Sequence, residues 1–471
     1  MLVNNLINLI ADILKILWNS PKPTDKLLSE IFRSKKNIGS KERRFASELI
    51  FSILRNKILL DYFINQLENN NLIDKNNNRY LLYIYIFLLL KTIDYDISPE
   101  FDPQALIERI NQNANIEEIL QSYFGDKNDS LRTYIISQMK IFEEIYAGYD
   151  KSQYLHYLSI RYSFPEWLLE KIVNKFNTKE QLQDFLQKST SAALPTIRIN
   201  TLNTNISEIE NELRNLQIKY SKSQIVPNAI ILYGRIQLSE LDFFKSGKVE
   251  IQDEGSQLIS YILDPQPGEI ILDACAGAGG KALLIAELMR NQGIVIANDI
   301  EYNRLKEIPK RAARSGITII QTNNSLKNSL DDLMNYNRNL RNGFDKILVD
   351  APCSGIGTIR RDPMRKYRIN PNLLEKLHKN QLKILIDYSK YVKMGGILVY
   401  STCSILQDEN EMVIDEFLAA NNNFVPDYIS PIINKNNIGI NNIIDDAFML
   451  NIDFTQSNAD GFFMARMKRI E

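Results

Sequence analysis

Cysteine and histidine are scarce in this chain. Its 471 residues include three cysteines and two histidines, and no two cysteines form a CxxC pair. So few thiols argue against a disulfide framework and favour a reducing, cytoplasmic compartment. With only His156 and His378 available, a zinc site is not expected, and we predict that the protein holds no metal.

Net charge and long hydrophobic runs are also lacking. The formal net charge is -1, so any affinity for nucleic acid must come from local basic patches. The N-terminal stretch "MLVNNLINLIADILKILW" is interrupted by asparagines, Asp12 and Lys15. It therefore predicts an amphipathic helix and not a signal peptide or a membrane span.

Glycine and proline are rare in the first third of the chain. Residues 1–150 contain three glycines and four prolines, and apolar residues recur at helical spacing, as in "ASELIFSILRNKILLDYFINQL". This pattern predicts an all-helical domain over residues 1–150. The segment from Arg79 to Ile93 is apolar nearly all round, which is typical of a buried central helix.

The pattern changes after residue 150. Residues 151–250 mix helical stretches with short strands such as "TIRINT" and "KVEIQD", which predicts a small α+β subdomain. Over residues 251–471 the strands "EIILDA", "IVIAND", "ITIIQT", "KILVDA" and "ILVYST" alternate with helical stretches. Such alternation predicts an α/β, Rossmann-like domain with a doubly wound, mostly parallel sheet and ligands at the carboxyl ends of its strands.

A glycine-rich turn follows the first of these strands, in "ILDACAGAGGKALLIAELM". The turn has neither the GxGxxG nor the GxxxxGK[ST] spacing, so a pyrophosphate is not the expected ligand. Asp299 ends the next strand, where an acid can accept hydrogen bonds from both ribose hydroxyls. S-adenosylmethionine has a ribose and no phosphate, so it fits this pattern. We therefore favour a loop that binds this cofactor over the alternative of a tight turn with a purely structural role.

Two cysteines stand at the ends of the fourth and fifth strands. Asp350 leads into Ala-Pro-Cys353, and "ILVYST" leads into Cys403, so both thiols should open onto the cofactor crevice. Each cysteine alone is more typical of a small buried hydrophobe. Two cysteines at adjacent strand ends favour a catalytic role instead. Ser404 and Gln407 predict a capping box at the start of a helix, and a helix N-terminus there would stabilise a thiolate at Cys403.

Methylation of C5 in a pyrimidine needs both a thiolate and S-adenosylmethionine. C5 is a poor nucleophile until a thiolate adds to C6 and makes it enamine-like. Asp350 is placed to hydrogen-bond or protonate N3, and Cys353 is the candidate acid/base group for the release step. A DNA cytosine-C5 methyltransferase with Cys353 as nucleophile, and a non-catalytic RNA-binding assembly factor, are the alternatives.

Several motifs carry a family resemblance. "LDACAGAGGK", "VDAPCSGIGTIRRDP", "GGILVYSTCSILQDENE" and "ADGFFMARMKR" resemble the Sun (Fmu-like) family of RNA 5-methylcytosine methyltransferases. "KERRFASELIFSILRNKILLDYFI" looks like the NusB-like, RNA-binding helical domain of one bacterial branch, and the middle segment looks like the family's small RNA-binding subdomain. The resemblance implies an enzyme that acts on small-subunit ribosomal RNA, and we expect it to be a cytoplasmic monomer.

The resemblance also implies residue roles. Cys403 is then the nucleophile, Cys353 assists breakdown of the covalent adduct, and Asp350 lies between cofactor and base. The implied cofactor-binding residues are Cys275, Ala276, Gly277, Ala278, Gly279, Gly280, Lys281, Asp299, Asn323 and Asp350. Ala278 stands where the family has proline, and Asn323 stands where it has an acid, so we expect weaker cofactor binding; a decayed enzyme is the alternative.

Two sets of residues are candidates for RNA contact. The first, in "RRDPMRKYR" after the Pro-Cys turn, could bind phosphates and comprises Arg360, Arg361, Arg365, Lys366 and Arg368. The second, Arg198 and Asn200 in "TIRINT", resembles the family's sequence at this point and could help to place RNA. A solvated face for the first set and a structural pair for the second are the alternatives.

Overall fold

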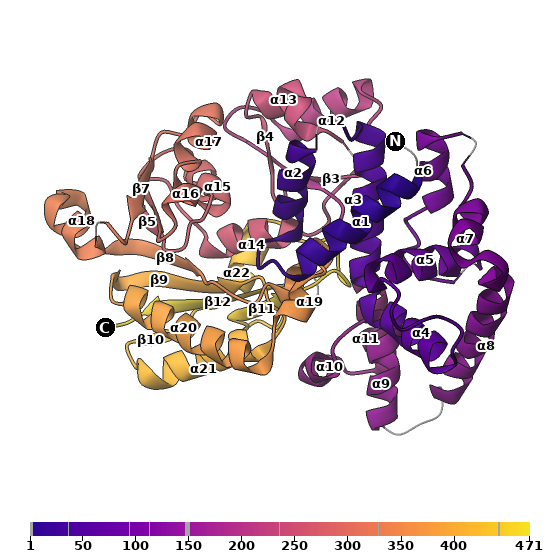
Figure 1. Ribbon diagram of the computed structural model, residues 1–471. Helices are drawn as coiled ribbons and strands as arrows, with labels where there is room; N and C mark the ends of the chain where they lie inside the picture. The colour runs from indigo at the N-terminus through magenta and orange to yellow at the C-terminus, as the bar shows by residue number, and fades with distance from the viewer. Residues whose placement is uncertain are drawn as a thin grey trace. The chain divides into compact units, whose positions relative to one another are not determined.

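Figure 1 shows the computed structural model of the chain. It describes residues 3–35, 37–93, 95–112, 114–146, 151–234, 236–327, 329–440 and 443–471. The chain forms two compact units, one of Met1–Ala192 with Ile359–Ile369 and one of Ala193–Thr358 with Asn370–Glu471. Among the described residues, no helix combines the length and apolarity that crossing a membrane requires.

The first unit is helical. Its α-helices are α1 (Val3–Trp18), α2 (Thr24–Ser34), α3 (Ser40–Arg55), α4 (Lys57–Asn69), α5 (Arg79–Thr92), α6 (Pro103–Ile110), α7 (Ile116–Phe124), α8 (Asn128–Tyr146), α9 (Lys151–Tyr162), α10 (Glu166–Ile172), α11 (Lys179–Ser189) and α19 (Arg365–Arg368). Helix α5 is the buried central helix expected from its sequence, because every residue from Leu82 to Leu90 is buried.

The boundaries of this unit differ from those expected. The helices α9, α10 and α11 belong to it, so it extends to Ala192, whereas the sequence favoured a boundary after residue 150. Residues 147–150 lie outside the described part of the chain. The segment Ile359–Ile369 also belongs to this unit, where Met364 is part of the hydrophobic core.

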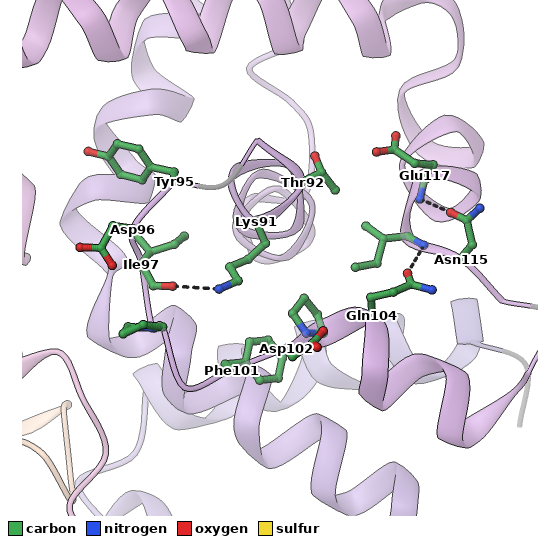
Figure 2. Close-up of a pocket in the computed structure, with 13 residues that line it drawn as sticks. Lys91, Thr92, Tyr95, Asp96, Ile97, Phe101, Asp102, Gln104, Asn115 and Glu117 are labelled. Atoms are coloured by element: carbon green, nitrogen blue, oxygen red, sulfur yellow. Dashed lines mark hydrogen bonds between the residues drawn. The ribbon is translucent and has the colours of Figure 1, made fainter.

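A cavity of about 620 Å³ opens within the helical unit. In Figure 2, Lys91 extends into it from α5 and donates a hydrogen bond to the carbonyl of Ile97 at 3.3 Å. Asn115 accepts from the backbone of Glu117 at the start of α7. The lining side chains thus largely serve helix ends and turns of this unit.

The second unit contains two sheets. The smaller is antiparallel, in the order β2 (Tyr220–Lys222), β3 (Ala229–Leu232), β1 (Thr196–Ile199) and β4 (Val249–Ile251), with α12 (Ile206–Asn215) and α13 (Asp242–Lys245). Apolar side chains of β1, β3 and α12 form its core. This sheet lies largely within the span 151–250 for which the sequence predicted a small α+β subdomain, but residues 151–192 of that span belong to the helical unit.

The larger sheet has the order β10 (Phe424–Pro426), β12 (Phe462–Arg469), β9 (Val392–Thr402), β8 (Phe344–Asp350), β5 (Ile270–Asp273), β6 (Ile294–Asp299) and β7 (Ile320–Asn324), with β11 (Met449–Ile452) beside β12. The five strands from β9 to β7 are parallel, and β12 is antiparallel to β9. The expected mostly parallel, doubly wound sheet is therefore confirmed.

Helices cover both faces of this sheet (Figure 1). They are α14 (Glu254–Leu263), α15 (Gly280–Leu288), α16 (Tyr302–Leu305), α17 (Ile308–Arg314), α18 (Leu330–Tyr336), α20 (Pro371–Ser389), α21 (Glu411–Ala420) and α22 (Ser430–Lys435). Alternate residues of β9 face opposite sides: Val399 packs with α14 and α15, whereas Leu398 and Tyr400 pack with α20 and α21. In a sheet covered in this way, ligands bind at the edge formed by the carboxyl ends of the parallel strands.

Candidate active site

The two cysteines predicted to converge lie in contact. Cys353 Sγ and Cys403 Sγ are 3.3 Å apart, at the carboxyl ends of the neighbouring parallel strands β8 and β9. The amide of Gly357 donates to the carbonyl of Cys403 at 3.0 Å, so the two loops are also joined through their backbones. The hydrogen bond with Cys403, followed by burial, raises the pKa of Cys353 well above its ordinary value.

The helix expected directly after Cys403 begins later. A short 3-10 turn, η6 (Gln407–Glu409), comes first, and α21 starts only at Glu411. Ser404 Oγ donates to the Glu409 carboxylate, so the capping box predicted for Ser404 and Gln407 is wrong. A helix N-terminus therefore does not explain a thiolate at Cys403.

Asp350 forms an ion pair beside the thiols. Its Oδ2 lies 2.7 Å from Lys281 Nζ, and its Oδ1 accepts from Ser401 Oγ at 3.0 Å. Burial disfavours the charged form of Lys281, but the carboxylate of Asp350 outweighs it and raises the pKa of the lysine. Lys281 is therefore held as a cation next to the end of β8.

The glycine-rich loop has the shape of a ligand cradle. The amide of Gly277 donates to Asp299 Oδ2 at 2.7 Å, which ties the loop after β5 to the end of β6. Gly277 and Gly279 have positive φ angles of 55° and 85°. A Cβ at Gly279 would lie 2.7 Å from Ile308 Cγ1, so this position needs glycine. Such a loop and acid fit the ribose and amino-acid end of S-adenosylmethionine.

Hydrogen bonds support the backbone at both departures from the family pattern, Ala278 and Asn323. Arg311 donates to the carbonyl of Ala278 at 2.6 Å, so the loop is held without the proline expected there. Asn323 is buried, and its amide donates to Asn298 Oδ1 at 2.8 Å. Asn298 in turn donates to the carbonyl of Ala274 at 3.0 Å, so Asn323 supports the end of β5 through its neighbour.

Comparisons with known proteins agree with this geometry. The model of the 16S rRNA methyltransferase RsmB/F family matches residues 260–468, and the model of its ferredoxin-like domain matches residues 164–239. A probable ribosomal RNA small subunit methyltransferase B from Bacillus subtilis is 31% identical, over 85% of each chain. The chain belongs to the RsmB/F family.

Two further relatives support this placement. Ribosomal RNA small subunit methyltransferase B from Yersinia enterocolitica is 30% identical, over 81% of this chain and 83% of its own. A solved methyltransferase homologue from Pyrococcus horikoshii is 25% identical with a TM-score of 0.53, over 66% of this chain and 97% of its own. The prediction of an S-adenosylmethionine-dependent RNA methyltransferase is therefore confirmed.

Members of this family act on RNA, yet two residues proposed to contact it are buried in the second unit. Arg198 Nη1 lies 3.0 Å from Glu287 Oε2, and the two side chains are 2% and 3% exposed. Asn200 Nδ2 donates to the carbonyls of Gly247 and Ser315, both at 2.9 Å. Both side chains have a structural role, and the prediction of RNA contact is wrong for them.

The basic segment after Cys353 is also used internally. Lys366 is buried in the helical unit and donates to the carbonyls of Arg55 at 3.0 Å and Tyr162 at 3.3 Å. Arg360 and Arg368 donate to the carbonyls of Ala192 and Ser20 in the same unit. These three side chains are therefore poor candidates for phosphate contact.

The two other basic residues of that segment are still candidates for RNA contact. Arg361 is exposed and Arg365 is half-buried, so both remain proposed RNA contacts. No cluster of three or more potential metal-ligating side chains occurs in the described ranges of the chain.

Glu409, in the acidic stretch "DENE", lies beside the candidate site although it was not among the site residues predicted from the sequence. It is fully buried and accepts hydrogen bonds from Ser354 and Ser404, the residues that follow the two cysteines. The signal available in the sequence was that a serine follows each cysteine, as Cys353-Ser354 and Cys403-Ser404.

Proposed function

We propose that this protein methylates C5 of a cytosine in small-subunit ribosomal RNA, through a covalent adduct on Cys403. We further propose that it does so as a cytoplasmic monomer. The observation that carries the proposal is the 3.3 Å separation of the two thiols beside the Asp350–Lys281 pair. The RsmB/F family and the names of its relatives support the substrate.

The reaction would begin with the target cytosine out of its stack and against the strand ends. Cys403 gives up its thiol proton to solvent, the thiolate Sγ bonds to C6, and the electron pair of the C5–C6 double bond moves to C5, which becomes nucleophilic. Asp350, carrying a proton taken up with the base, donates a hydrogen bond to N3 and stabilises the negative charge that develops on the ring. When bound, S-adenosylmethionine supplies the electrophilic methyl group, and Lys281 keeps Asp350 in place from the cofactor side.

Release would need Cys353 as a base. Cys353 Sγ takes the proton from C5, the C5–C6 double bond re-forms, and the C6–Sγ bond to Cys403 breaks. In the free protein the hydrogen bond with Cys403 is the largest cause of the raised pKa of Cys353. Once Cys403 is bonded to carbon, its charge is gone and that hydrogen bond is weakened, so Cys353 more readily gives up its own proton to solvent before it takes the proton from C5.

Two cysteine variants test the proposal. The protein is incubated with RNA and labelled cofactor, and both product and covalent protein–RNA adduct are measured. Cys403→Ala should give neither product nor adduct, whereas Cys353→Ala should accumulate adduct and release little product. Asp415→Asn, at an exposed position on α21, serves as the control and should behave like wild type.

The outcomes separate the mechanisms. Methylation by Cys403→Ala at the wild-type rate would refute Cys403 as nucleophile. Loss of all adduct in Cys353→Ala, with adduct retained in Cys403→Ala, would instead support the arrangement in which Cys353 attacks.

A further inference from the structure

Glu409 is a carboxylate buried where the two catalytic loops meet. It ends the 3-10 turn η6 and is 0% exposed. Glutamate is rarely buried unless its charge is matched by hydrogen bonds, because leaving water is costly for a carboxylate. The partners of Glu409 therefore indicate what it is for.

Those partners come from three segments around the thiols. Glu409 Oε1 accepts from the amide of Ser354 at 2.7 Å and from Gln381 Nε2 at 3.0 Å. Its Oε2 accepts from Ser354 Oγ and from Ser404 Oγ, each at 2.5 Å. Gln381, on α20, also donates to the carbonyl of Pro352 at 3.0 Å. One carboxylate thus holds the residue after each cysteine and is itself braced by α20.

We propose that Glu409 is a positioning residue that clamps the loops after β8 and β9 and thereby sets the separation of Cys353 Sγ and Cys403 Sγ. This inference rests on the proposed function, in which Cys403 attacks and Cys353 takes the C5 proton of the same base. Both steps need sulfur atoms placed on one ring within a fraction of an ångström. Charge-assisted hydrogen bonds to a buried carboxylate supply that rigidity.

Activation of the thiols is not a competing explanation for Glu409. A negative charge beside a thiol disfavours the thiolate, and the charge of Glu409 contributes to the raised pKa of Cys353. If reactivity alone mattered, a neutral residue would serve better at this position. The carboxylate therefore works against ionisation of Cys353, and its geometric role is what remains.

The first test uses the protein alone and does not depend on methylation. Diamide oxidises two adjacent thiols to a disulfide while it is reduced to the hydrazine, and the rate reports how well the Cys353 and Cys403 thiols are aligned. Peptide mapping by mass spectrometry identifies that pair. Glu409→Ala should slow its formation by about tenfold or more, since intramolecular rates follow preorganisation. Removal of the charge would by itself speed the reaction, so a fall in rate reports geometry.

Matched variants sharpen this test. Glu409→Gln lacks the charge but can bond both serines, because hydroxyl groups can donate or accept; its rate should stay within about threefold of wild type. Ser404→Ala removes only the bond from the β9 loop and should slow the reaction by an intermediate factor, which keeps the test decisive if Glu409→Ala does not fold. Wild-type rates in Glu409→Ala, or in Ser404→Ala where only that variant folds, would overturn the proposal.

The second test uses RNA and cofactor. If Glu409 aligns Cys353 for release, Glu409→Ala should raise the ratio of covalent adduct to methylated product, whereas Glu409→Gln should restore the wild-type ratio. A general loss of structure would lower adduct and product in proportion, and that result would overturn the positioning role. Failure of the proposed function itself is recognised separately, by methylation in Cys403→Ala.

Discussion

Arg198→Ala distinguishes a structural from an RNA-binding role for the conspicuous arginine of "TIRINT". Arg198, on β1, pairs with Glu287 on α15 at 3.0 Å, and both side chains are almost fully buried. The substitution leaves the Glu287 carboxylate in the interior without its cation. We therefore expect a large loss of stability in the second unit, and little change in RNA affinity for the protein that remains folded.

The size of the loss follows from burial. Removal of one partner from a buried ion pair destabilises a protein by about 3–5 kcal/mol. Glu287 also accepts from the amide and hydroxyl of Thr201, both at 3.0 Å, so it is not left bare and we expect a value near the lower limit. For a unit of this size each kcal/mol shifts the midpoint by about 2–4 °C, so Tm should fall by roughly 6–12 °C.

The loss should depend on pH. Burial raises the pKa of Glu287, and the charge of Arg198 opposes that rise, so the pKa in the folded variant is higher still. A carboxyl whose pKa is raised on folding binds more protons in the folded state, and stability then falls as pH increases. The gap between wild type and Arg198→Ala should therefore be wider at pH 8 than at pH 5.

Thermal unfolding followed by circular dichroism, with RNA titrations on the folded protein, measures both quantities. Lys222→Ala is the matched control, because Lys222, on β2 of the same sheet, pairs with Glu210 of α12 but is 56% exposed; the loss of stability should be under about 1 kcal/mol. Unfolding of Arg198→Ala at the wild-type temperature, together with weakened RNA binding, would refute this reasoning.

Three further expectations concern charged side chains, two of them buried. Burial, followed by the charge of Asp350, raises the pKa of Asp273 to about 7, so Asp273→Asn should be more stable than wild type by roughly 2–4 kcal/mol at pH 8, with the gap closing toward pH 4. Lys366→Ala should lower the unfolding midpoint of the helical unit and leave the salt dependence of RNA binding unchanged, whereas Arg361→Ala should reduce that slope by about 1. A reduced slope in Lys366→Ala would restore Lys366 as a phosphate contact.

The sequence predicted those features that local pattern determines. Strand–helix alternation predicted the parallel sheet, and the position of each polar residue at a strand end placed Asp299, Asp350, Cys353 and Cys403 at one edge. Convergence follows from topology, because parallel strands bring their carboxyl ends together whatever the details of packing. That is why the convergence of the two thiols could be predicted from residues 50 positions apart, although their direct contact could not.

The predictions that were wrong concerned residues whose partners lie far away in the sequence. A run of positive charges indicates where cations are, but not whether backbone carbonyls of another segment will bury them, as happens to Lys366. The sequence likewise did not show that Arg198 pairs with Glu287 of α15, which prevents it from contacting RNA. Glu409 was not predicted as a site residue, because its hydrogen-bond donors Ser354 and Gln381 are 55 and 28 residues distant in the sequence.

The clamp at Glu409 has a further consequence for the loop of Cys353. The chain leaves the second unit after Thr358 and joins the helical unit from Ile359 onward, only a few residues past the thiol. Any displacement of that segment would be transmitted along the backbone toward Cys353 unless something intervenes. The bonds from Ser354 to Glu409 lie between the thiol and that crossing, so in the proposed clamp they hold the backbone next to Cys353 to the Cys403 loop.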